Sequence, residues 1–197
     1  MEQGKTFIVS GPSGVGKSTV LRELFRGRDD LYFSISATTR EPREGEQDGV
    51  HYHFIDVSRF QELIESDSLL EYAEYVGNFY GTPKKYVDKA MNEGKDVILD
   101  IEVQGAIQVK TKRPDTVRIF IAPPSWDELE RRLRSRGTDS DEKIQKRLLR
   151  AKTELQTADV YDYFVINDTV DRAVREISAI MLAEHCKPAD RMKILSE

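Results

Sequence analysis

A glycine-rich segment near the N terminus constrains the fold more than any other part of the sequence. Residues 11–18 read GPSGVGKS, which fits the pattern G-x-x-x-x-G-K-[ST] of phosphate-binding loops. The apolar run KTFIVSG (5–11) predicts a strand before the loop, and VLRELFRG (20–27), with apolar residues at helical spacing, predicts a helix after it. A strand, loop and helix in this order favour a phosphate site over a simple glycine turn.

The residue types in this loop suit the phosphates of a bound nucleotide. Glycines let backbone N–H groups converge on phosphate oxygens, and the helix N terminus adds a partial positive charge. We expect Lys17 to reach the outer phosphates and the Ser18 hydroxyl to ligate Mg²⁺. The residues predicted to bind the nucleotide here are Gly11, Pro12, Ser13, Gly14, Val15, Gly16, Lys17, Ser18 and Thr19.

Further apolar runs predict the rest of the core. DVILDIE (96–102), VRIFIAP (117–123) and YFVIND (163–168) alternate with helical patterns at 102–112 and 169–185. Strands that alternate with helices imply an α/β fold with a parallel sheet covered on both faces, as in three-layer phosphate-loop proteins.

The segment between residues 32 and 82 breaks this alternation with shorter, tyrosine-rich pieces such as HYHFID and LLEYAEYVGNFYG, and a Gly-Asn pair at 77–78. We expect a small mixed or antiparallel lobe inserted into the core. Thr82 followed by Pro83 predicts an N-cap and a first-turn proline, and Gly94 is expected to end that helix.

The segment 126–152 holds nine Lys/Arg and six Asp/Glu, a local basic excess in a chain of net charge −5. Ser125 with Glu128 predicts a capping box for a helix to about Arg136, followed by a break and a second helix over 141–158. The predicted organisation is one domain over 1–186, with a core of 1–35 and 83–186, a lobe of 37–82, a lid of about 126–152 and a tail of 187–197.

Composition narrows the class of protein. The acidic balance argues against a general nucleic-acid binder, and no apolar run approaches the roughly 20 residues that span a bilayer. The N-terminal apolar stretch is too short for a signal peptide, so we expect a cytoplasmic protein. Cys186 is the single cysteine and is read as an incidental thiol. His51 and His53 alternate on a predicted strand, but a metal site there is disfavoured because no third ligand is evident.

Two arginines in the inserted lobe favour a second phosphate site. Arg40 and Arg43 flank a proline in a segment rich in turn formers, and paired guanidinium groups suit phosphate oxygens. A solvated charged loop is the competing interpretation, because Glu41, Glu44 and Glu46 are interleaved.

Seven segments, in this order and spacing, resemble the guanylate kinase family of phosphate-loop nucleoside monophosphate kinases: GPSGVGKST, FSISATTREPREGEQDGVHYHF, EYAEYVGNFYGTP, VILDIEVQG, IFIAPPS, RLRSRGTDS and VIND. The resemblance covers roughly residues 5–185. It implies transfer of the γ-phosphate of ATP to GMP, with dGMP as a further acceptor, giving ADP and GDP with the help of Mg²⁺. We expect GMP and ATP as partners, and no nucleic acid, no membrane and no obligate protein partner.

The resemblance also implies the acceptor site. The phosphate of GMP would be held by Arg40, Arg43, Tyr52 and Tyr80. Guanine offers N1–H and N2–H₂ donors beside an O6 acceptor, which a carboxylate at Glu71 and hydroxyls at Ser36 and Thr82 would complement, whereas adenine would not. The whole set implied for GMP is Ser36, Arg40, Arg43, Glu46, Tyr52, Glu71, Tyr80, Thr82, Asp100 and Glu102.

Other positions follow from the same resemblance. Asp100 ends an apolar run, which places it at the ligand-binding edge of a parallel sheet, where it would contact GMP or reach Mg²⁺ through water. Glu102 stands where the family often has Asp, so its role is left open. Asn167 would contact the base of ATP, although a turn after the strand explains it almost as well. The residues implied in catalysis are Lys17, Arg40, Arg132, Arg136 and Arg147.

Two other interpretations stay open. Domains like guanylate kinase also occur as scaffolds that have lost catalysis and bind phosphorylated partners, but such domains would be expected to lose phosphate-loop residues that this chain keeps. A phosphate-loop kinase with another acceptor, such as a different nucleotide or a sugar phosphate, is the second. In the kinase reading, we expect the lobe and the lid to close over both nucleotides and exclude water.

Overall fold

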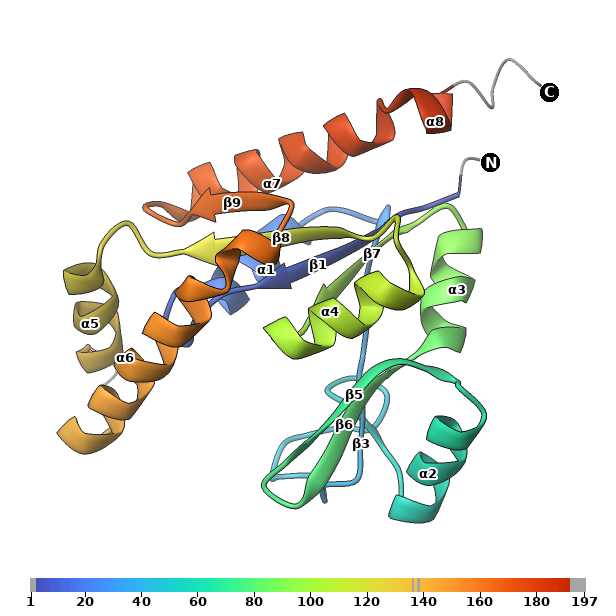
Figure 1. Ribbon diagram of the computed structural model, residues 1–197, viewed down its shortest axis with the longest axis horizontal. Coiled ribbons are helices and arrows are strands. Elements are labelled where there is room, and N and C mark those ends of the chain that lie inside the picture. Colours follow the sequence, from blue (N-terminus) through green and yellow to red (C-terminus); the bar gives the residue numbers. More distant parts are fainter. Residues whose placement is uncertain (1–2, 136, 138, 192–197) are drawn as a thin grey trace. The chain divides into compact units, whose positions relative to one another are not determined.

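The apolar runs of the sequence form the strands of a five-stranded sheet in the computed structural model, which describes residues 3–135, 137 and 139–191 (Figure 1). β2 runs parallel to β7, and β8 runs parallel to β9. All five residues of β1 are buried. The predicted α/β class with a parallel sheet and a second, mixed sheet is confirmed. In spatial order the strands are β2 (Leu31–Phe33), β7 (Asp96–Asp100), β1 (Thr6–Ser10), β8 (Val117–Ala122) and β9 (Tyr163–Ile166).

The chain divides into two compact units. The first unit is made of residues 1–8 and 29–117, and the second of residues 9–28 and 118–197. The predicted lobe therefore lies wholly in the first unit, and the predicted lid lies wholly in the second.

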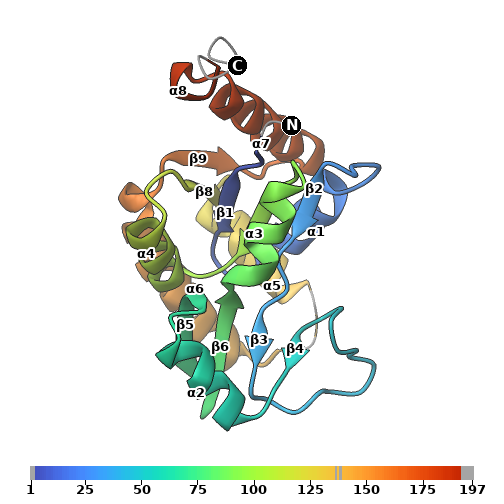
Figure 2. The ribbon, with the colours of Figure 1, turned by 90° about the vertical axis from the view of Figure 1, so that its right-hand side faces the viewer.

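A four-stranded sheet and three helices complete the first unit. β3 pairs with β4 in parallel and with β6 in antiparallel orientation, and β6 pairs with β5, so the sheet is mixed, as predicted (Figure 2). The strands are β4 (His53–Phe54), β3 (Ala37–Thr38), β6 (Asn78–Pro83) and β5 (Leu69–Tyr75) in spatial order, and the helices are α2 (Val57–Glu65), α3 (Lys84–Asn92) and α4 (Val103–Lys112).

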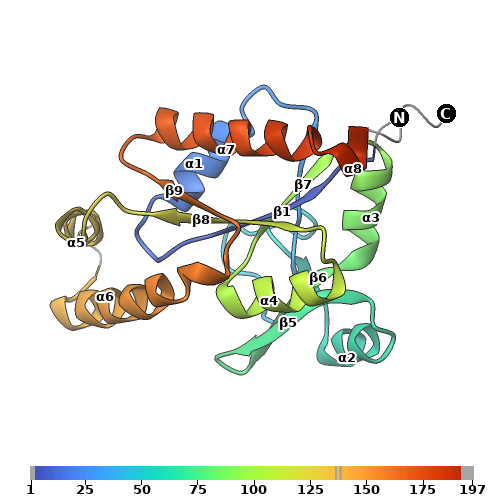
Figure 3. The ribbon, with the colours of Figure 1, turned by 45° about the horizontal axis from the view of Figure 1, so that its top comes forward.

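The second unit is mostly helical. α7 packs along α1, and α5 packs against α6 around a small apolar core (Figure 3). Side-chain oxygens of Ser125, Ser140 and Thr169 cap the N termini of α5, α6 and α7, each accepting from a backbone N–H in the first turn. The helices are α1 (Lys17–Leu24), α5 (Trp126–Arg134), α6 (Asp141–Gln156), a 3-10 turn (Ala158–Val160), α7 (Val170–His185) and α8 (Pro188–Arg191).

The structure corrects two details of the inserted segment. Helix α2 was not predicted: Asp56 caps its N terminus, and Phe60, Leu63 and Ile64, at helical spacing, pack together on one of its faces. The β5–β6 turn is formed by Val76 and Gly77, both with positive φ, because Tyr75 pairs with Asn78. Asn78 is therefore the first residue of β6 rather than part of the turn.

Thr82 is not the N-cap of the following helix. Pro83 occupies that position, and the Thr82 side chain forms a hydrogen bond inside the unit instead. Among the histidines, His51 lies in a turn and His53 in β4, so the expected shared strand face does not form. In the part of the chain that the structure describes, no helix is both long and apolar enough to span a membrane.

Candidate active site

The loop between β1 and α1 depends on glycine at two close approaches. Gly14 and Gly16 both have φ of 93°, a left-handed conformation that side chains disfavour. A Cβ at Gly14 would lie 2.5 Å from Leu133 Cδ2, and one at Gly16 would lie 2.7 Å from Asn167 Nδ2. Gly16 is also the N-cap of α1 and offers no side chain to the first-turn amides. The helix N terminus is thus open to an anion.

The carbonyl oxygen of Val15 fastens this loop to the end of β9 and to α5. It accepts hydrogen bonds from Asn167 Nδ2 at 2.7 Å and from an Arg132 guanidinium nitrogen at 3.0 Å. Arg132 also donates to the Asn167 carbonyl at 3.0 Å and to Glu128 Oε1 at 2.7 Å. Asn167 is only 3% exposed. Together with Arg132 it therefore stabilises the loop through the Val15 carbonyl.

Arg147 contacts the loop from helix α6. Two of its guanidinium nitrogens lie 2.6 and 3.2 Å from Ser13 Oγ, and a third pairs with Asp139. Lys143, 2.5 Å from the same carboxylate, and then Arg147 lower the pKa of Asp139. Asp139 thus stays ionised and holds Arg147 toward the loop.

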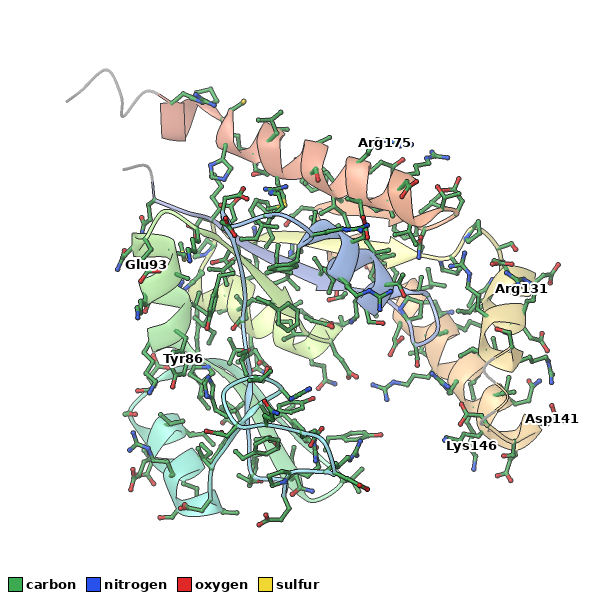
Figure 4. All side chains as sticks on the ribbon, turned by 180° about the vertical axis from the view of Figure 1, so that it is seen from behind. Tyr86, Glu93, Arg131, Asp141, Lys146 and Arg175 are labelled. Atoms are coloured by element: carbon green, nitrogen blue, oxygen red, sulfur yellow. The ribbon has the colours of Figure 1, made fainter. Side chains whose placement is uncertain are left out.

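Other charged residues of α5 and α6 lie on the outer surface. Arg131, Asp141 and Lys146 are exposed and pair with residues of the same two helices, Glu128, Arg134 and Glu142 (Figure 4). Arg131 and then Arg132 lower the pKa of Glu128 to about 2, so this carboxylate remains charged at neutral pH. Arg136, predicted to be catalytic, lies outside the described residues.

The remaining loop residues occupy the predicted strand-to-helix turn. Lys17 is the first residue of α1 and is half-buried, and Ser18 follows it with an exposed side chain. Pro12 is buried, and its carbonyl accepts from the Val15 N–H at 3.1 Å. The loop residues predicted to bind the nucleotide, Gly11, Pro12, Ser13, Gly14, Val15, Gly16, Lys17, Ser18 and Thr19, all belong to the second unit, as does Asn167.

In the first unit, Arg40 is the centre of a charged and aromatic cluster. Two of its nitrogens each lie 2.9 Å from one oxygen of Glu46, a paired arrangement of parallel hydrogen bonds. Its guanidinium carbon lies 5.4 Å from the ring centre of Tyr52 and 5.8 Å from that of Phe54. The Tyr52 and Tyr80 rings meet edge to face at 6.0 Å. This arrangement holds one cation at a fixed place.

Glu46 is the partner that fixes Arg40. Its carboxylate also accepts from the Arg43 backbone N–H at 2.7 Å, while the residue Arg43 itself is exposed. The hydrogen bonds from Arg40 and then from Arg43 lower the pKa of Glu46 to about 2. Glu46 is therefore ionised at neutral pH and accepts hydrogen bonds from both neighbouring arginines.

Glu71 is buried in β5 beside Thr82 of β6. The two residues are 7% and 1% exposed, and the Thr82 hydroxyl donates to Glu71 Oε1 at 2.6 Å. Burial raises the pKa of Glu71, and hydrogen bonds from Thr82 oppose that rise. Ser36 is half-buried just before β3, where its carbonyl accepts from the His53 N–H at 2.8 Å.

Two carboxylates lie at the end of β7 and just after it. Asp100 is its last residue and is exposed, and Glu102 is the N-cap of α4, whose first turn receives no hydrogen bond from that side chain. Tyr52 has a raised pKa, first because it is half-buried and then through Tyr80, with smaller contributions from Glu46 and Asp100. All ten residues predicted for GMP therefore lie in the first unit, and Asp100 acts electrostatically on the Arg40 cluster.

Three residues that contact the predicted site were not found from the sequence: Phe54 beside Arg40, Asp139 beside Arg147, and Gly105 beside Glu71. Phe54 is two residues from Tyr52 in the sequence, and such spacing is a weak signal that two side chains share a strand face. The sequence carries no signal for the other two residues. Gly105 is far from Glu71 along the chain, and Asp139 is one of many charged residues in its segment.

Known proteins match this chain over nearly its whole length. A family model described as guanylate kinase matches residues 3–184. A guanylate kinase of Bacillus anthracis is 54% identical over 186 residues, covering 94% of this chain and 91% of that protein. One of Desulfitobacterium hafniense is 52% identical over 189 residues, covering 95% of this chain and 94% of that protein.

A solved structure gives the same result. The crystal structure of guanylate kinase from Anaplasma phagocytophilum matches with a TM-score of 0.74 at 32% identity, covering 96% of this chain and 90% of that chain. The family match, the identity of the relatives and this structural likeness extend well beyond the phosphate loop. The chain belongs to the guanylate kinase family.

Proposed function

We propose that this protein transfers the γ-phosphate of ATP to GMP, giving ADP and GDP. The observation that carries the proposal is the buried Glu71 carboxylate, held by Thr82 at 2.6 Å in the same unit as the Arg40 cluster. A buried carboxylate accepts from N1–H and N2–H₂ of guanine together, which adenine cannot satisfy. Family membership supports the same acceptor.

Thr82 acts on guanine through Glu71 in this proposal. A carboxylate has about four lone-pair sites, so Oε1 accepts from Thr82 while the carboxylate also accepts from the base. Because the Thr82 hydroxyl proton is used in that bond, the donor to guanine O6 is Ser36. This assignment refines the role expected for Thr82 from sequence.

The acceptor phosphate requires cations rather than a general base. Its second pKa is near ~6, so a phosphate oxygen of GMP is already largely ionised at neutral pH. Arg40, fixed by Glu46 and flanked by Tyr52, supplies a positioned positive charge, and Tyr80 adds a hydroxyl. We assign the GMP phosphate to Arg40, Arg43, Tyr52 and Tyr80.

The donor nucleotide belongs to the glycine-rich loop. We propose that the first-turn amides of α1 and Lys17 bind its phosphates, while Arg132, Asn167 and Arg147 keep the loop in shape. Mg²⁺ bound with ATP would offset charge on the phosphates. The Ser18 hydroxyl, a hard oxygen donor on an exposed side chain, fits it as a ligand, and Asp100 stays the predicted contact through water.

The acceptor assay tests the proposal directly. Purified protein with ATP and Mg²⁺ is given GMP, dGMP, AMP, CMP or UMP in turn, and ADP formation is followed. We expect turnover with GMP, and dGMP is the second acceptor to examine. Rapid turnover with AMP and none with GMP would refute the acceptor, and no turnover with any acceptor would favour a scaffold that has lost catalysis.

Two variants test the roles proposed for Lys17 in phosphoryl transfer and for Glu71 in GMP binding. Lys17→Ala should abolish transfer, and Glu71→Ala should weaken GMP binding more than ATP binding. Circular dichroism and thermal unfolding serve as controls for folding in both. Equal loss of both nucleotides in Glu71→Ala would contradict its role with guanine. The cytoplasmic location and the absence of other partners remain predictions from the sequence.

A further inference from the structure

Glu71 lies at an irregular point of an edge strand. β5 ends the strand order β4-β3-β6-β5, so only one of its sides pairs with another strand of that sheet. Leu69 pairs with Pro83 and Tyr72 with Gly81, which leaves Leu70 and Glu71 together opposite Thr82. Such a bulge redirects a side chain and interrupts the ladder of hydrogen bonds. The strand alone therefore holds Glu71 loosely.

Helix α4 replaces the missing strand partner. The Gln108 side-chain amide accepts from the Tyr72 N–H at 3.2 Å and donates to the Tyr72 carbonyl at 3.1 Å, as a neighbouring strand residue would. One turn further, Lys112 donates to the Leu69 carbonyl at 2.8 Å. α4 lies beside β5 (Figure 3), so these two side chains hold the strand on both sides of the bulge.

Gly105 brings the same face of α4 against the carboxylate itself. It precedes Gln108 by three residues and so shares its side of the helix. A Cβ at Gly105 would lie 2.9 Å from Glu71 Oε2 and 3.3 Å from Glu71 Cδ. The carboxylate is therefore bounded by Thr82 on Oε1 and by the helix backbone near Oε2.

We propose that α4 sets the position of the Glu71 carboxylate for guanine, with Gln108 as a positioning residue and Gly105 as the surface that the carboxylate rests against. The inference rests on the proposed function of Glu71. Two donors of guanine must meet one carboxylate, so a small rotation of the strand costs one of the two hydrogen bonds. Gln108 fixes that rotation through the main chain of Tyr72, the residue next to Glu71.

Inosine monophosphate, used as an alternative acceptor, distinguishes a displaced Glu71 carboxylate from a general loss of protein stability. Its base keeps N1–H and O6 but lacks the N2 amino group, so it uses only one of the two hydrogen bonds to Glu71. A displaced carboxylate should therefore harm GMP more than inosine monophosphate. A merely destabilised protein should lose activity with both acceptors in the same proportion.

The main test compares Gln108→Met with the parent and with Gln104→Met, a matched change at an exposed position of the same helix. Methionine keeps the length and helix preference of glutamine but removes the amide. We expect KM for GMP to rise about ten-fold, equivalent to about 1.4 kcal/mol, and the preference for GMP over inosine monophosphate in kcat/KM to fall several-fold. KM for ATP and the Gln104→Met protein should stay near the parent.

Gly105→Ala reaches Glu71 by a different route. Alanine favours a helix by about 1 kcal/mol over glycine, so a purely structural role predicts no loss of thermal stability. The added methyl group must instead displace the carboxylate. We expect a higher KM for GMP and a lower preference over inosine monophosphate, with ATP affinity unchanged.

The outcomes distinguish this inference from the proposed function. If the parent does not phosphorylate GMP, the proposed function fails. If the parent does so while Gln108→Met leaves the ratio of GMP to inosine monophosphate unchanged, the positioning role is overturned and the function stands. A rise in KM for ATP as large as that for GMP would also overturn it.

Discussion

Thr82 donates its hydroxyl proton to Glu71 Oε1 at 2.6 Å, and both residues are almost fully buried. Burying a carboxylate without hydrogen-bond partners costs far more free energy than burying a neutral polar group, because a charge is removed from water. Hydrogen bonds from the hydroxyl and the backbone N–H of Thr82 stabilise this carboxylate within the protein. In the proposed function, its remaining lone pairs accept from N1–H and N2–H₂ of guanine.

Thr82→Val should raise KM for GMP about ten-fold and lower the stability of the fold. Valine keeps the shape of threonine but removes the donor, and a buried acceptor left unpaired costs about 1–3 kcal/mol. Steady-state kinetics and thermal unfolding measure the two effects. Thr82→Ser is the matched control, because it keeps the hydroxyl; a Val variant that behaves like the Ser variant would contradict the importance of this bond.

Glu71→Gln should raise the melting temperature at pH 7.5 while it lowers kcat/KM for GMP by about ten-fold or more, since hydrogen bonds to charged groups contribute about 1.5–3 kcal/mol each. Burial raises the pKa of Glu71, so at neutral pH the folded state contains a charge that it disfavours. The amide removes that charge and keeps an oxygen for Thr82.

The pH dependence of this difference has a definite sign. A carboxyl with a raised folded pKa destabilises the fold at high pH, and that penalty disappears as the pH falls through the folded pKa toward the unfolded value of about 4.3. The stability advantage of Glu71→Gln over the parent should therefore shrink between pH 7.5 and about 4.5. An advantage that grows with acidity would show that burial does not govern this carboxylate.

The sequence predicts the core strands and the loop because their signals are local. β1 is five consecutive buried residues next to a glycine pattern, and neighbours along the chain decide both features. Helix α2 was missed although Phe60, Leu63 and Ile64 recur at helical spacing, because this short helix lies between pieces whose alternating pattern indicates strands. The local rule for helix caps failed at Thr82 because a tertiary partner, Glu71, takes its hydroxyl.

The contacts that shape the candidate site are not local, which is why sequence alone could not place them. Arg132 reaches Val15 across 117 residues, and Asn167 reaches it across 152. Glu128 and Arg132 form an ion pair that spacing along one helix favours, because residues four apart face each other. Helical spacing does not predict the contact of Arg132 with Val15 in the glycine-rich loop.

Glu46→Gln should raise KM for GMP on the order of ten-fold through Arg40, because a misplaced binding group weakens the aligned complex. The pKa of Glu46 is lowered to about 2, so its stabilising contribution is complete above the unfolded pKa near ~4.3 and is lost only as the pH falls toward 2. Between pH 5.5 and 8, the pH dependence of KM should follow the GMP phosphate in both proteins. Curves that differ in slope would show that Glu46 titrates in this range.

Asn167→Ala should raise KM for ATP about five- to ten-fold and leave KM for GMP unchanged. The change removes the hydrogen bond from Nδ2 to the Val15 carbonyl, and a buried carbonyl left unpaired costs about 1–3 kcal/mol, part of which is recovered through the remaining bond from Arg132.

Arg172→Ala is the control for Asn167→Ala, since Arg172 lies on nearby α7 and forms exposed ion pairs with Asp168 and Glu176. Kinetics with each nucleotide varied in turn separate the effects, and calorimetric binding of ATP checks them without turnover. Because Asn167 and the loop belong to the second unit while Glu71 and Arg40 belong to the first, the two KM values report on different units. A rise in KM for GMP equal to that for ATP in Asn167→Ala would mean that Val15 supports more than the donor loop.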